Sequence, residues 1–425
     1  MERAHTVYVD LGGQSHLVGR LWTRARRGQE SATFEYDRSW LALPTCFALE
    51  PALILGPGPH HTPAGKALFG ALGDSAPDRW GRVLMRRAER RRAMAEKTQP
   101  RTLLEIDFLT MVDDRTRQGA LRFAEKDGGA FLAPADKLAI PPFVDLPRLL
   151  SASEKVLNDS EDDQDLRLLL APGSSLGGAR PKASVRDKDG TLAIAKFPQK
   201  SDEIRAVLWE AVALELAQKA GIETPTWRLE TIARKPVLLL RRFDREGEER
   251  IPFLSAMSML GASDNEQHSY LEIADVLRRH GAAPKDDLRQ LWRRIVFNVL
   301  ISNTDDHLRN HAFLFAGTHG WRLSPAYDLN PVPVEFKPRI LTTMIDELDG
   351  TASLELAFSV AAYFTIDPKD ARKIAGEVGG AVARWRTVAA TKGLKASEME
   401  RLASAFEHED LAAAVRGSKL AKKAG

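Results

Sequence analysis

The pattern of apolar and polar residues divides the chain into a β-rich beginning and a mostly helical end. Between Val7 and Trp40, short apolar alternating runs are broken by Gly12-Gly13 and Arg27-Gly28, which predicts a small antiparallel sheet. Between Pro63 and Lys97, apolar residues recur at helical spacing. A sheet followed by helix is therefore expected at the start of the chain.

A second sheet and a long helical part are expected from Ser174 onward. A Gly-containing turn is followed by a strand ending at Lys196, a helix at about 203–220, a strand ending at Leu240 and then mostly helix. Within the helical part, two short strand-like runs at 312–315 and 321–323 follow an apolar helix segment at 291–300. This order predicts an α+β chain with two lobes.

Composition limits the classes of protein that need to be considered. The chain has 425 residues, 44% hydrophobic and 28% charged, which is typical of one large enzyme or a few packed modules. A formal net charge of +3 gives no global electrostatic case for nucleic-acid binding. The single cysteine, Cys46, can form neither an internal disulfide nor a thiolate cluster for zinc. We expect a cytoplasmic protein, because the N-terminus lacks a signal-peptide core and no run approaches the roughly 20 apolar residues of a membrane span.

Three stretches of the chain are strongly charged. Eight Lys or Arg residues lie between Arg79 and Lys97, where a solvated helix face and contact with phosphates or an acidic partner are both open interpretations. The acidic stretch at 158–165 is expected to be an exposed connector. The basic stretch at the end of the chain, 417–425, is expected to be a frayed tail.

The densest cluster of polar residues follows the apolar segment at 291–300. It reads Asn303-Thr304-Asp305-Asp306-His307-Leu308-Arg309-Asn310, and Asp328 comes after the predicted hairpin. Phosphoryl transfer needs a carboxylate that orients the attacking hydroxyl, and an Asn and an Asp that hold magnesium. An Asp, four residues, an Asn and a later Asp match the spacing of the protein-kinase catalytic loop. Each residue alone is as well explained by a helix cap or turn, and His307 is expected to brace the loop.

Features upstream fit the binding of a nucleotide. The Gly-containing loop at 174–182 can bring its backbone close to phosphates. Lys196 ends an apolar strand, and Glu210 on the next helix is its expected partner, with Glu203 and Glu215 as competitors. The charged end of the strand at 236–245 is a candidate hinge for adenine. These features together favour a kinase.

The blocks in this order resemble the HipA family of type II toxin kinases. The motifs are Ser-x-x-Gly-Gly-Ala-x-x-Lys, the strand lysine, Arg-Phe-Asp-Arg, Asn-Thr-Asp-x-His-x-x-Asn and Ser-Pro-x-Tyr-Asp. Blocks at 34–37, 74–81 and 119–123 also look like the N-terminal module of that family. The resemblance implies a β-rich module at 1–125, the rest of the N-lobe at 126–245, a helical kinase lobe at 246–415 and a basic tail at 416–425.

The resemblance also implies roles for individual residues. Asp305 would be the catalytic carboxylate, and Asn310 and Asp328 would hold Mg²⁺ and the nucleotide. The other residues expected around ATP are Gly177, Gly178, Ala179, Lys182 and Lys196 at the phosphates, the backbone of Arg241 and Phe243 at the adenine, and His307 and Tyr327 lining the site. Arg241 stands where family members often have an acidic residue, and Arg180-Pro181 stiffens the loop.

Substrate and partners are implied in the same way. The expected substrate is a Ser or Thr of a protein, such as a translation component like an aminoacyl-tRNA synthetase. The expected partner is a helix-turn-helix antitoxin, through which DNA would be contacted only indirectly. Ser175 matches the serine that the family autophosphorylates, with Ser174 as the rival acceptor. Two other functions stay open: a small-molecule kinase of the aminoglycoside-phosphotransferase type, and a catalytically idle corepressor.

Overall fold

The first sheet is antiparallel and comes from the start of the chain. The computed structural model describes residues 2–132, 140–170 and 178–423, the last six of these by their backbone only, as is Thr318. Strands β1 (Glu2–Leu11), β2 (Gln14–Arg26), β3 (Gln29–Tyr36), β4 (Pro59–His61) and β5 (Leu121–Ala124) have the order β4-β3-β2-β1-β5. Gly12 and Gly13 both have positive φ, which the tight turn between β1 and β2 requires. The predicted N-terminal sheet is confirmed.

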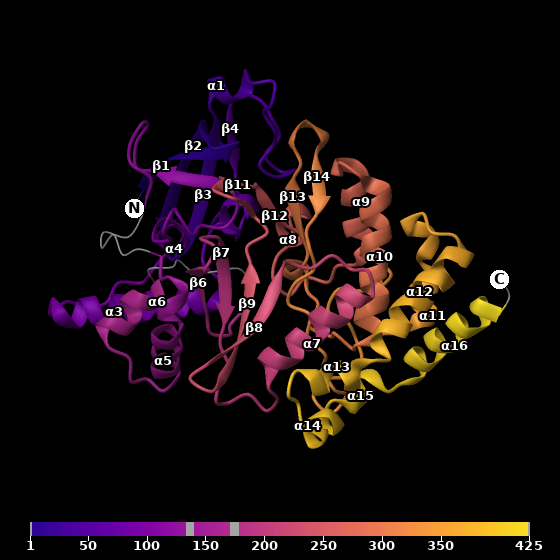
Figure 1. Ribbon diagram of the computed structural model, residues 1–425. Helices are drawn as coiled ribbons and strands as arrows, with labels where there is room; N and C mark the ends of the chain where they lie inside the picture. The colour runs from indigo at the N-terminus through magenta and orange to yellow at the C-terminus, as the bar shows by residue number, and fades with distance from the viewer. Residues whose placement is uncertain (1, 133–139, 171–177, 424–425) are drawn as a thin grey trace. The chain divides into compact units, whose positions relative to one another are not determined.

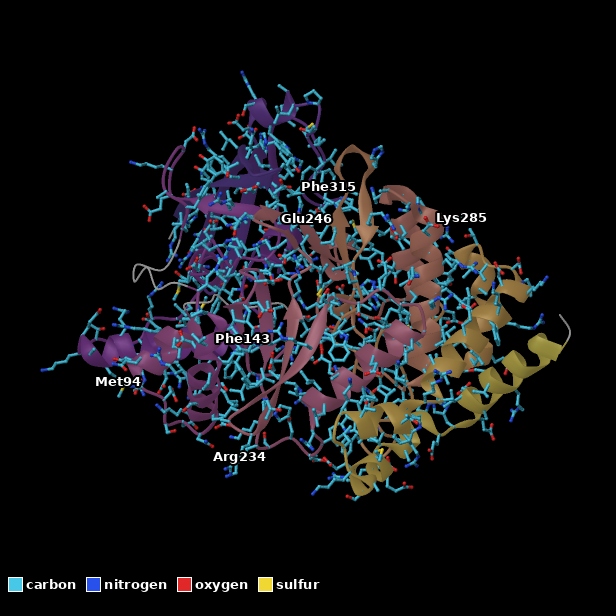
Figure 2. The ribbon with its side chains drawn as sticks, viewed as in Figure 1. Met94, Phe143, Arg234, Glu246, Lys285 and Phe315 are labelled. Carbon is cyan, nitrogen blue, oxygen red and sulfur yellow. The ribbon has the colours of Figure 1, made fainter. Side chains whose placement is uncertain are left out.

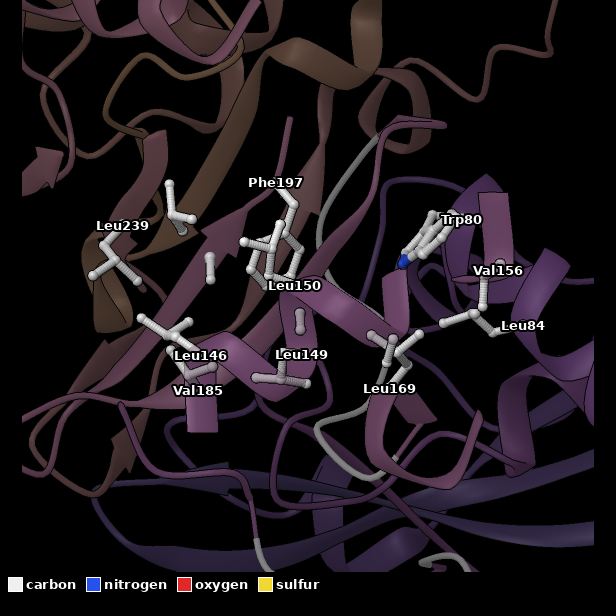
Figure 3. Packing of buried hydrophobic residues seen from close by; sticks show 14 of the residues in the cluster. Trp80, Leu84, Leu146, Leu149, Leu150, Val156, Leu169, Val185, Phe197 and Leu239 are labelled. Carbon is white, nitrogen blue, oxygen red and sulfur yellow. The ribbon is translucent and has the colours of Figure 1, made fainter. Parts of the chain in front are cut away.

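A second, four-stranded sheet has the order β6-β7-β9-β8. Its strands are β6 (Lys182–Arg186), β7 (Leu192–Lys196), β8 (Trp227–Ile232) and β9 (Lys235–Arg241). Helices α3 (Arg79–Ala95), α5 (Leu146–Leu157) and α6 (Asp163–Leu170) share one apolar core with β6, β7 and β9. Figure 3 shows Leu146 and Leu149 of α5 beside Val185 and Leu239 of the sheet. This core fixes the strand that ends at Lys196.

The basic stretch at 79–97 and the acidic stretch at 158–165 contact each other. Arg87 of α3 donates to Glu161 at 2.9 Å and pairs with Asp159 at 2.6 Å, and Arg91 pairs with Asp163 at 3.4 Å. Helix α6 begins within the acidic stretch. Six of the eight residues at 158–165 are exposed, as expected of a connector, whereas Glu161 is buried. The stretch also neutralises part of the basic face of α3.

The remaining short elements of this part complete one compact unit. Unit 1 comprises residues 1–201 and 229–261, and unit 2 comprises 202–228 and 262–425. The other elements of unit 1 are α1 (Arg38–Leu41), α2 (Gly70–Gly73), α4 (Glu105–Thr110), η1 (Phe143–Asp145), β10 (Arg245–Glu246), β11 (Glu249–Arg250), β12 (Phe253–Ser255) and α8 (Ala256–Met259). The 126–245 segment of the sequence-based division is thus shared between both units.

Unit 2 is mostly helical and is built around α10 (Pro284–Leu300), which contacts α9 (Tyr270–His280) and α12 (Pro368–Val382) (Figure 1). Helix α7 (Ala206–Lys219) packs on α12 and on α13, which begins at Trp385. Its Trp209 lies near the stacked rings of Trp385 and Phe406. The other elements are η2 (Leu308–Asn310), β13 (Ala312–Phe315), η3 (Gly317–His319), β14 (Trp321–Leu323), α11 (Leu354–Ser359), η4 (Ala361–Phe364), α13 (Trp385–Thr391), α14 (Ala396–Arg401), α15 (Ala403–Phe406) and α16 (Glu409–Lys423).

Two further properties of the helices are the extent of the last one and their hydropathy. Helix α16 continues into the basic terminal segment as far as Lys423, so the backbone expected to be frayed is helical up to that residue. Along the described ranges, no helix combines the length and the apolar character needed to cross a lipid bilayer.

Candidate functional site

The site in unit 2 begins where α10 ends. The backbone turns at Ser302, which has a φ of +51°, and the Asn303 amide donates to the carbonyl of Asn298 at 2.9 Å. Residues 301–304 are buried, whereas 60% of the Asp305 side chain is exposed. The loop therefore presents one carboxylate to solvent on a buried base.

Asp306, the next residue, is buried and holds this loop in place. Its Oδ2 accepts hydrogen bonds from Asn298 Nδ2 at 2.8 Å, from His311 Nε2 at 2.7 Å and from the Tyr270 hydroxyl. Burial by itself would raise the pKa of the Asp306 carboxyl, but the His311 ring and the hydrogen bonds from His311 and Tyr270 outweigh it and lower the pKa. Asp306 thus ties α9 and α10 to the loop as a charged acceptor.

Asn310 lies within the same loop, at the end of η2. Its Nδ2 donates to the Asp305 carbonyl at 3.2 Å, and its backbone amide donates to the His307 carbonyl at 2.8 Å. Because the amide nitrogen is used inside the loop, the side-chain oxygen is the atom that can bind a cation. The fold of the loop therefore suits Asn310 as a metal ligand.

The hairpin of β13 and β14 returns the chain to this loop. Phe313 pairs with Leu323, and the Tyr327 hydroxyl donates to the Arg309 carbonyl at 2.7 Å. The Asn330 amide donates to Asn303 Oδ1 at 3.3 Å, and Asn330 Nδ2 donates to the Asp328 carbonyl at 3.1 Å. The loop carrying Asp328 is thereby linked to the loop carrying Asp305 and Asn310.

The backbone of Asp328 is in the left-handed region, with a φ of +55°. Such a conformation costs free energy for a residue other than glycine and persists only where the surroundings impose it. Buried Arg294 of α10 contributes to these surroundings, because it donates to the Ser324 carbonyl just before Asp328. Burial lowers the pKa of Arg294 to about 10, so it remains charged at neutral pH. A half-buried Asp in this conformation is a candidate functional residue.

His307 makes hydrogen bonds inside the loop through its backbone, because its amide donates to the Asp305 carbonyl at 2.9 Å and its carbonyl accepts from the Asn310 amide. Its ring Nδ1 is buried and has no hydrogen-bond partner among the described residues, and the side-chain bonds that hold the loop come from Asp306. Sequence reasoning missed Asp306, Asn298, Tyr270 and His311. One signal was available, since Asn298 is a polar residue inside the apolar helix segment at 291–300, where a buried polar side chain needs partners.

Lys196 and Glu210 occupy different units. Lys196 ends β7, is half-buried and pairs in the sheet with Lys182, whereas Glu210 is a buried residue of α7. The first belongs to unit 1 and the second to unit 2. Their ion pair remains a prediction.

The Gly-containing loop is described only from Gly178 onward, so Ser174, Ser175 and Gly177 lie outside the described residues. Gly178 has a φ of +87°, and Ala179 is exposed. Lys182, expected at the phosphates, is buried and donates to Asp78 Oδ2 at 2.8 Å, and its carbonyl accepts from Trp80 Nε1 at 3.0 Å. In this structure the Lys182 ammonium is thus held by the start of α3.

The expected adenine hinge is firmly anchored within unit 1. Arg241 pairs with Ala193 in the sheet, and Phe243 stands between Arg242 and Asp244, which form a buried ion pair. Arg242 also donates to the Thr116 carbonyl at 2.7 Å. Burial would raise the pKa of Asp244, but the adjacent Arg242 and Arg245 charges hold it below its usual value. Binding of adenine at this strand end remains a prediction.

Comparisons with known proteins identify the domain that carries the site. Residues 174–385 match the model of the HipA-like C-terminal domain. A Haemophilus influenzae protein named "Putative kinase" is 24% identical over 216 residues, which cover 44% of this chain and 62% of that protein. The Sinorhizobium fredii protein "Putative kinase Y4mE" is 25% identical over 181 residues, which cover 36% of this chain and 41% of that protein. The chain thus spans less than two thirds of the length of either relative.

A solved structure extends the likeness to the whole fold. HipA of Shewanella oneidensis MR-1, solved in complex with HipB and its operator DNA, superposes with a TM-score of 0.62. The match covers 98% of this chain and 97% of that chain at 15% identity. At this identity the match shows the fold, and it confirms the predicted α+β, HipA-like class. With its C-terminal domain at residues 174–385, the chain belongs to the HipA-like family.

Proposed function

We propose that the protein is an ATP-dependent kinase of the HipA type, which transfers the γ-phosphoryl group to a serine or threonine of a protein. The observation that carries the proposal is the joining of two loops in unit 2. Hydrogen bonds from Tyr327 and Asn330 hold the Asp328 loop against the loop that presents Asp305 and Asn310. The family and the kinase names of the relatives support the same function.

Asp305 would act on the acceptor hydroxyl. Its carboxylate is exposed while the residues on both sides are buried, so an acceptor can approach it without disturbing the fold. There it would orient the hydroxyl and take up its proton as the new oxygen–phosphorus bond forms and the bond to ADP breaks. Buried Asp306 would keep the loop in this geometry.

Asn310 and Asp328 would hold Mg²⁺. The amide oxygen of Asn310 and the carboxylate of Asp328 are the hard oxygen ligands that this ion prefers, and the strained backbone of Asp328 is held by its surroundings. The described residues contain no group of three or more His, Cys, Asp or Glu side chains suited to a metal. This fits an ion that takes its other ligands from phosphates and water. When bound, Mg²⁺ would neutralise charge on the transferred group.

Upstream residues would bind the rest of ATP. Gly178 and Ala179 would approach the phosphates through their backbone, and Lys196 would neutralise them. The backbone of Arg241 and Phe243 would hold the adenine. Ser175 would be the autophosphorylated residue, and its phosphate would compete with the triphosphate for the same backbone amides.

The proposed setting is that of a cytoplasmic toxin whose target is a translation component and whose inhibitor is a helix-turn-helix protein. The Shewanella HipA structure was solved with HipB and operator DNA, which supports a DNA-binding partner for this chain. A net charge of +3 supports DNA contact through that partner rather than through the kinase itself.

The experiment is the incubation of the purified chain and its Asp305→Asn variant with labelled Mg²⁺-ATP and a cell lysate. Label in lysate proteins with the unmodified chain only is the expected result. Label in small molecules would instead favour a phosphotransferase of the aminoglycoside type. Equal, negligible labelling with both chains would favour an idle corepressor.

A further inference from the structure

The segment that follows Asp328 is hydrogen-bonded at both ends to the loop of Asp305. At one end, the Val332 amide donates to the Ser302 carbonyl at 3.2 Å. At the other end, the amide and the hydroxyl of Thr342 both donate to the Thr304 carbonyl, at 3.2 and 2.8 Å, and those of Thr343 both donate to the Asp306 carbonyl, at 3.1 and 2.7 Å. We call residues 332–343 the arch. Both ends of the arch are thus tied to residues that lie on either side of Asp305 in the loop.

The middle of the arch is also fixed. Arg339 donates to Ser302 Oγ and to the Val299 carbonyl, each at 3.0 Å, and pairs with Asp410 at 2.8 Å. The Phe336 and Lys337 amides both donate to the Pro333 carbonyl, at 3.0 and 3.3 Å, which makes a tight turn. Pro333 and Pro338 further restrict the backbone around this turn. The base of the Lys337 side chain is therefore held in a defined place.

The Lys337 side chain points at the candidate catalytic carboxylate. Its Nζ lies 3.2 Å from Asp305 Oδ1, and the two side chains are 55% and 60% exposed. An ion pair as exposed as this contributes little to stability. Stability therefore gives little reason for a rigid arch that places an ammonium group here.

We propose that Lys337 is a catalytic residue that contacts the transferred phosphoryl group, an inference that rests on the proposed kinase function. In the step, the acceptor hydroxyl passes its proton to Asp305, its oxygen bonds to phosphorus, and the bond from phosphorus to the ADP oxygen breaks. Lys337 stays protonated throughout. Its ammonium group leaves the Asp305 carboxylate, which is being neutralised by the proton, and binds the phosphoryl oxygens.

Lysine suits this role because of its flexible four-carbon stem. A compact ammonium group on a fixed base can move between two neighbouring anions without any change in the backbone. The removal of one preorganised donor aimed at transition-state charge typically lowers kcat by about 10²–10³-fold. Because Lys337 is half exposed, we expect the lower end, about 10²-fold.

The test compares Lys337→Ala and Lys337→Arg with Lys285→Ala as the matched control. Lys285 is an exposed lysine of the same unit, on the first turn of α10, and is labelled in Figure 2. For Lys337→Ala we expect kcat to fall about 10²-fold with little change in KM for ATP or in the melting temperature. Lys337→Arg should recover part of the loss, and Lys285→Ala should match the unmodified chain.

A binding measurement gives a readout other than activity. ADP with aluminium fluoride mimics the planar phosphoryl group, so its affinity should fall in Lys337→Ala, while the affinity for ADP alone should not change. If Lys337→Ala leaves both kcat and the affinity for the mimic unchanged, this inference is overturned while the proposed kinase function stands. A kcat of Lys337→Ala above that of the unmodified chain would also overturn it, because it would show that Lys337 blocks Asp305. If the unmodified chain transfers no label, the proposed function fails and this inference fails with it.

Discussion

Asp305 and Asp306 are adjacent carboxylates for which we predict opposite effects of the same substitution. Asp306→Ala removes the one acceptor shared by Tyr270, Asn298 and His311, all of which are buried. Asp305→Ala removes a side chain that is 60% exposed. Asp306→Ala should therefore destabilise unit 2, and Asp305→Ala should abolish phosphoryl transfer with little change in stability.

The magnitudes follow from the partners that are lost. Each buried donor left without an acceptor costs about 1–3 kcal/mol, and loss of the charged member of a buried network typically costs about 3–5 kcal/mol in all. For Asp305→Ala the loss is at most that of an exposed ion pair, about 0–1 kcal/mol. In a domain of 150–250 residues, 1 kcal/mol shifts the melting temperature by about 2–4 °C. We expect a decrease of about 10 °C for Asp306→Ala.

The assay is thermal unfolding of both variants followed by circular dichroism, with phosphoryl transfer measured well below each melting temperature. A decrease for Asp306→Ala no greater than that for Asp305→Ala would refute the assignment of Asp306 as the residue that holds the loop. Normal transfer by folded Asp305→Ala would refute the assignment of Asp305.

Three further predictions concern both units. Asp78→Ala should destabilise unit 1 by about 3–5 kcal/mol, because it leaves the buried Lys182 ammonium without the Asp78 carboxylate. If urea unfolding is normal and ATP binding is altered, Lys182 acts at the phosphates instead. Burial, assisted by the Arg339 charge, lowers the pKa of His408 to about 4. The free energy of unfolding should therefore decrease by up to about 3 kcal/mol as the pH falls from above 6.5 to about 4, because His408 binds its proton more readily in the unfolded chain. Urea unfolding of His408→Gln should lack this pH dependence. Lys196→Ala should lower kcat/KM by about 10²–10³-fold at unchanged melting temperature, whereas a change in stability alone would indicate a structural lysine.

The motifs and elements that could be predicted depend on local spacing. The interval from Asp305 to Asn310, and the short strands before Asp328, reflect the loop and hairpin geometry of neighbouring residues. Helix periodicity and strand alternation are equally local, so the sheet at 7–40 and helices α7 and α10 appear where the pattern indicated them. These parts of the fold need no knowledge of distant contacts.

The contacts that position the site could not be predicted, because their partners are far apart in the sequence. Tyr270 reaches Asp306 across 36 positions, and Arg87 reaches Glu161 across 74. A carboxylate in a loop looks the same in the sequence whether it is exposed, as Asp305 is, or buried, as Asp306 is. Only packing decides which of the two adjacent residues is structural and which is available for chemistry.

The central claim is that the protein transfers a phosphoryl group from ATP to protein, with Asp305 accepting the proton of the acceptor hydroxyl and the metal held by Asn310 and Asp328. The most direct measurement is incorporation of the labelled γ-phosphate into protein by the unmodified chain and by Asp305→Asn, each with and without Mg²⁺. The account predicts incorporation only by the unmodified chain in the presence of Mg²⁺. Equal incorporation by folded Asp305→Asn under the same conditions would contradict it.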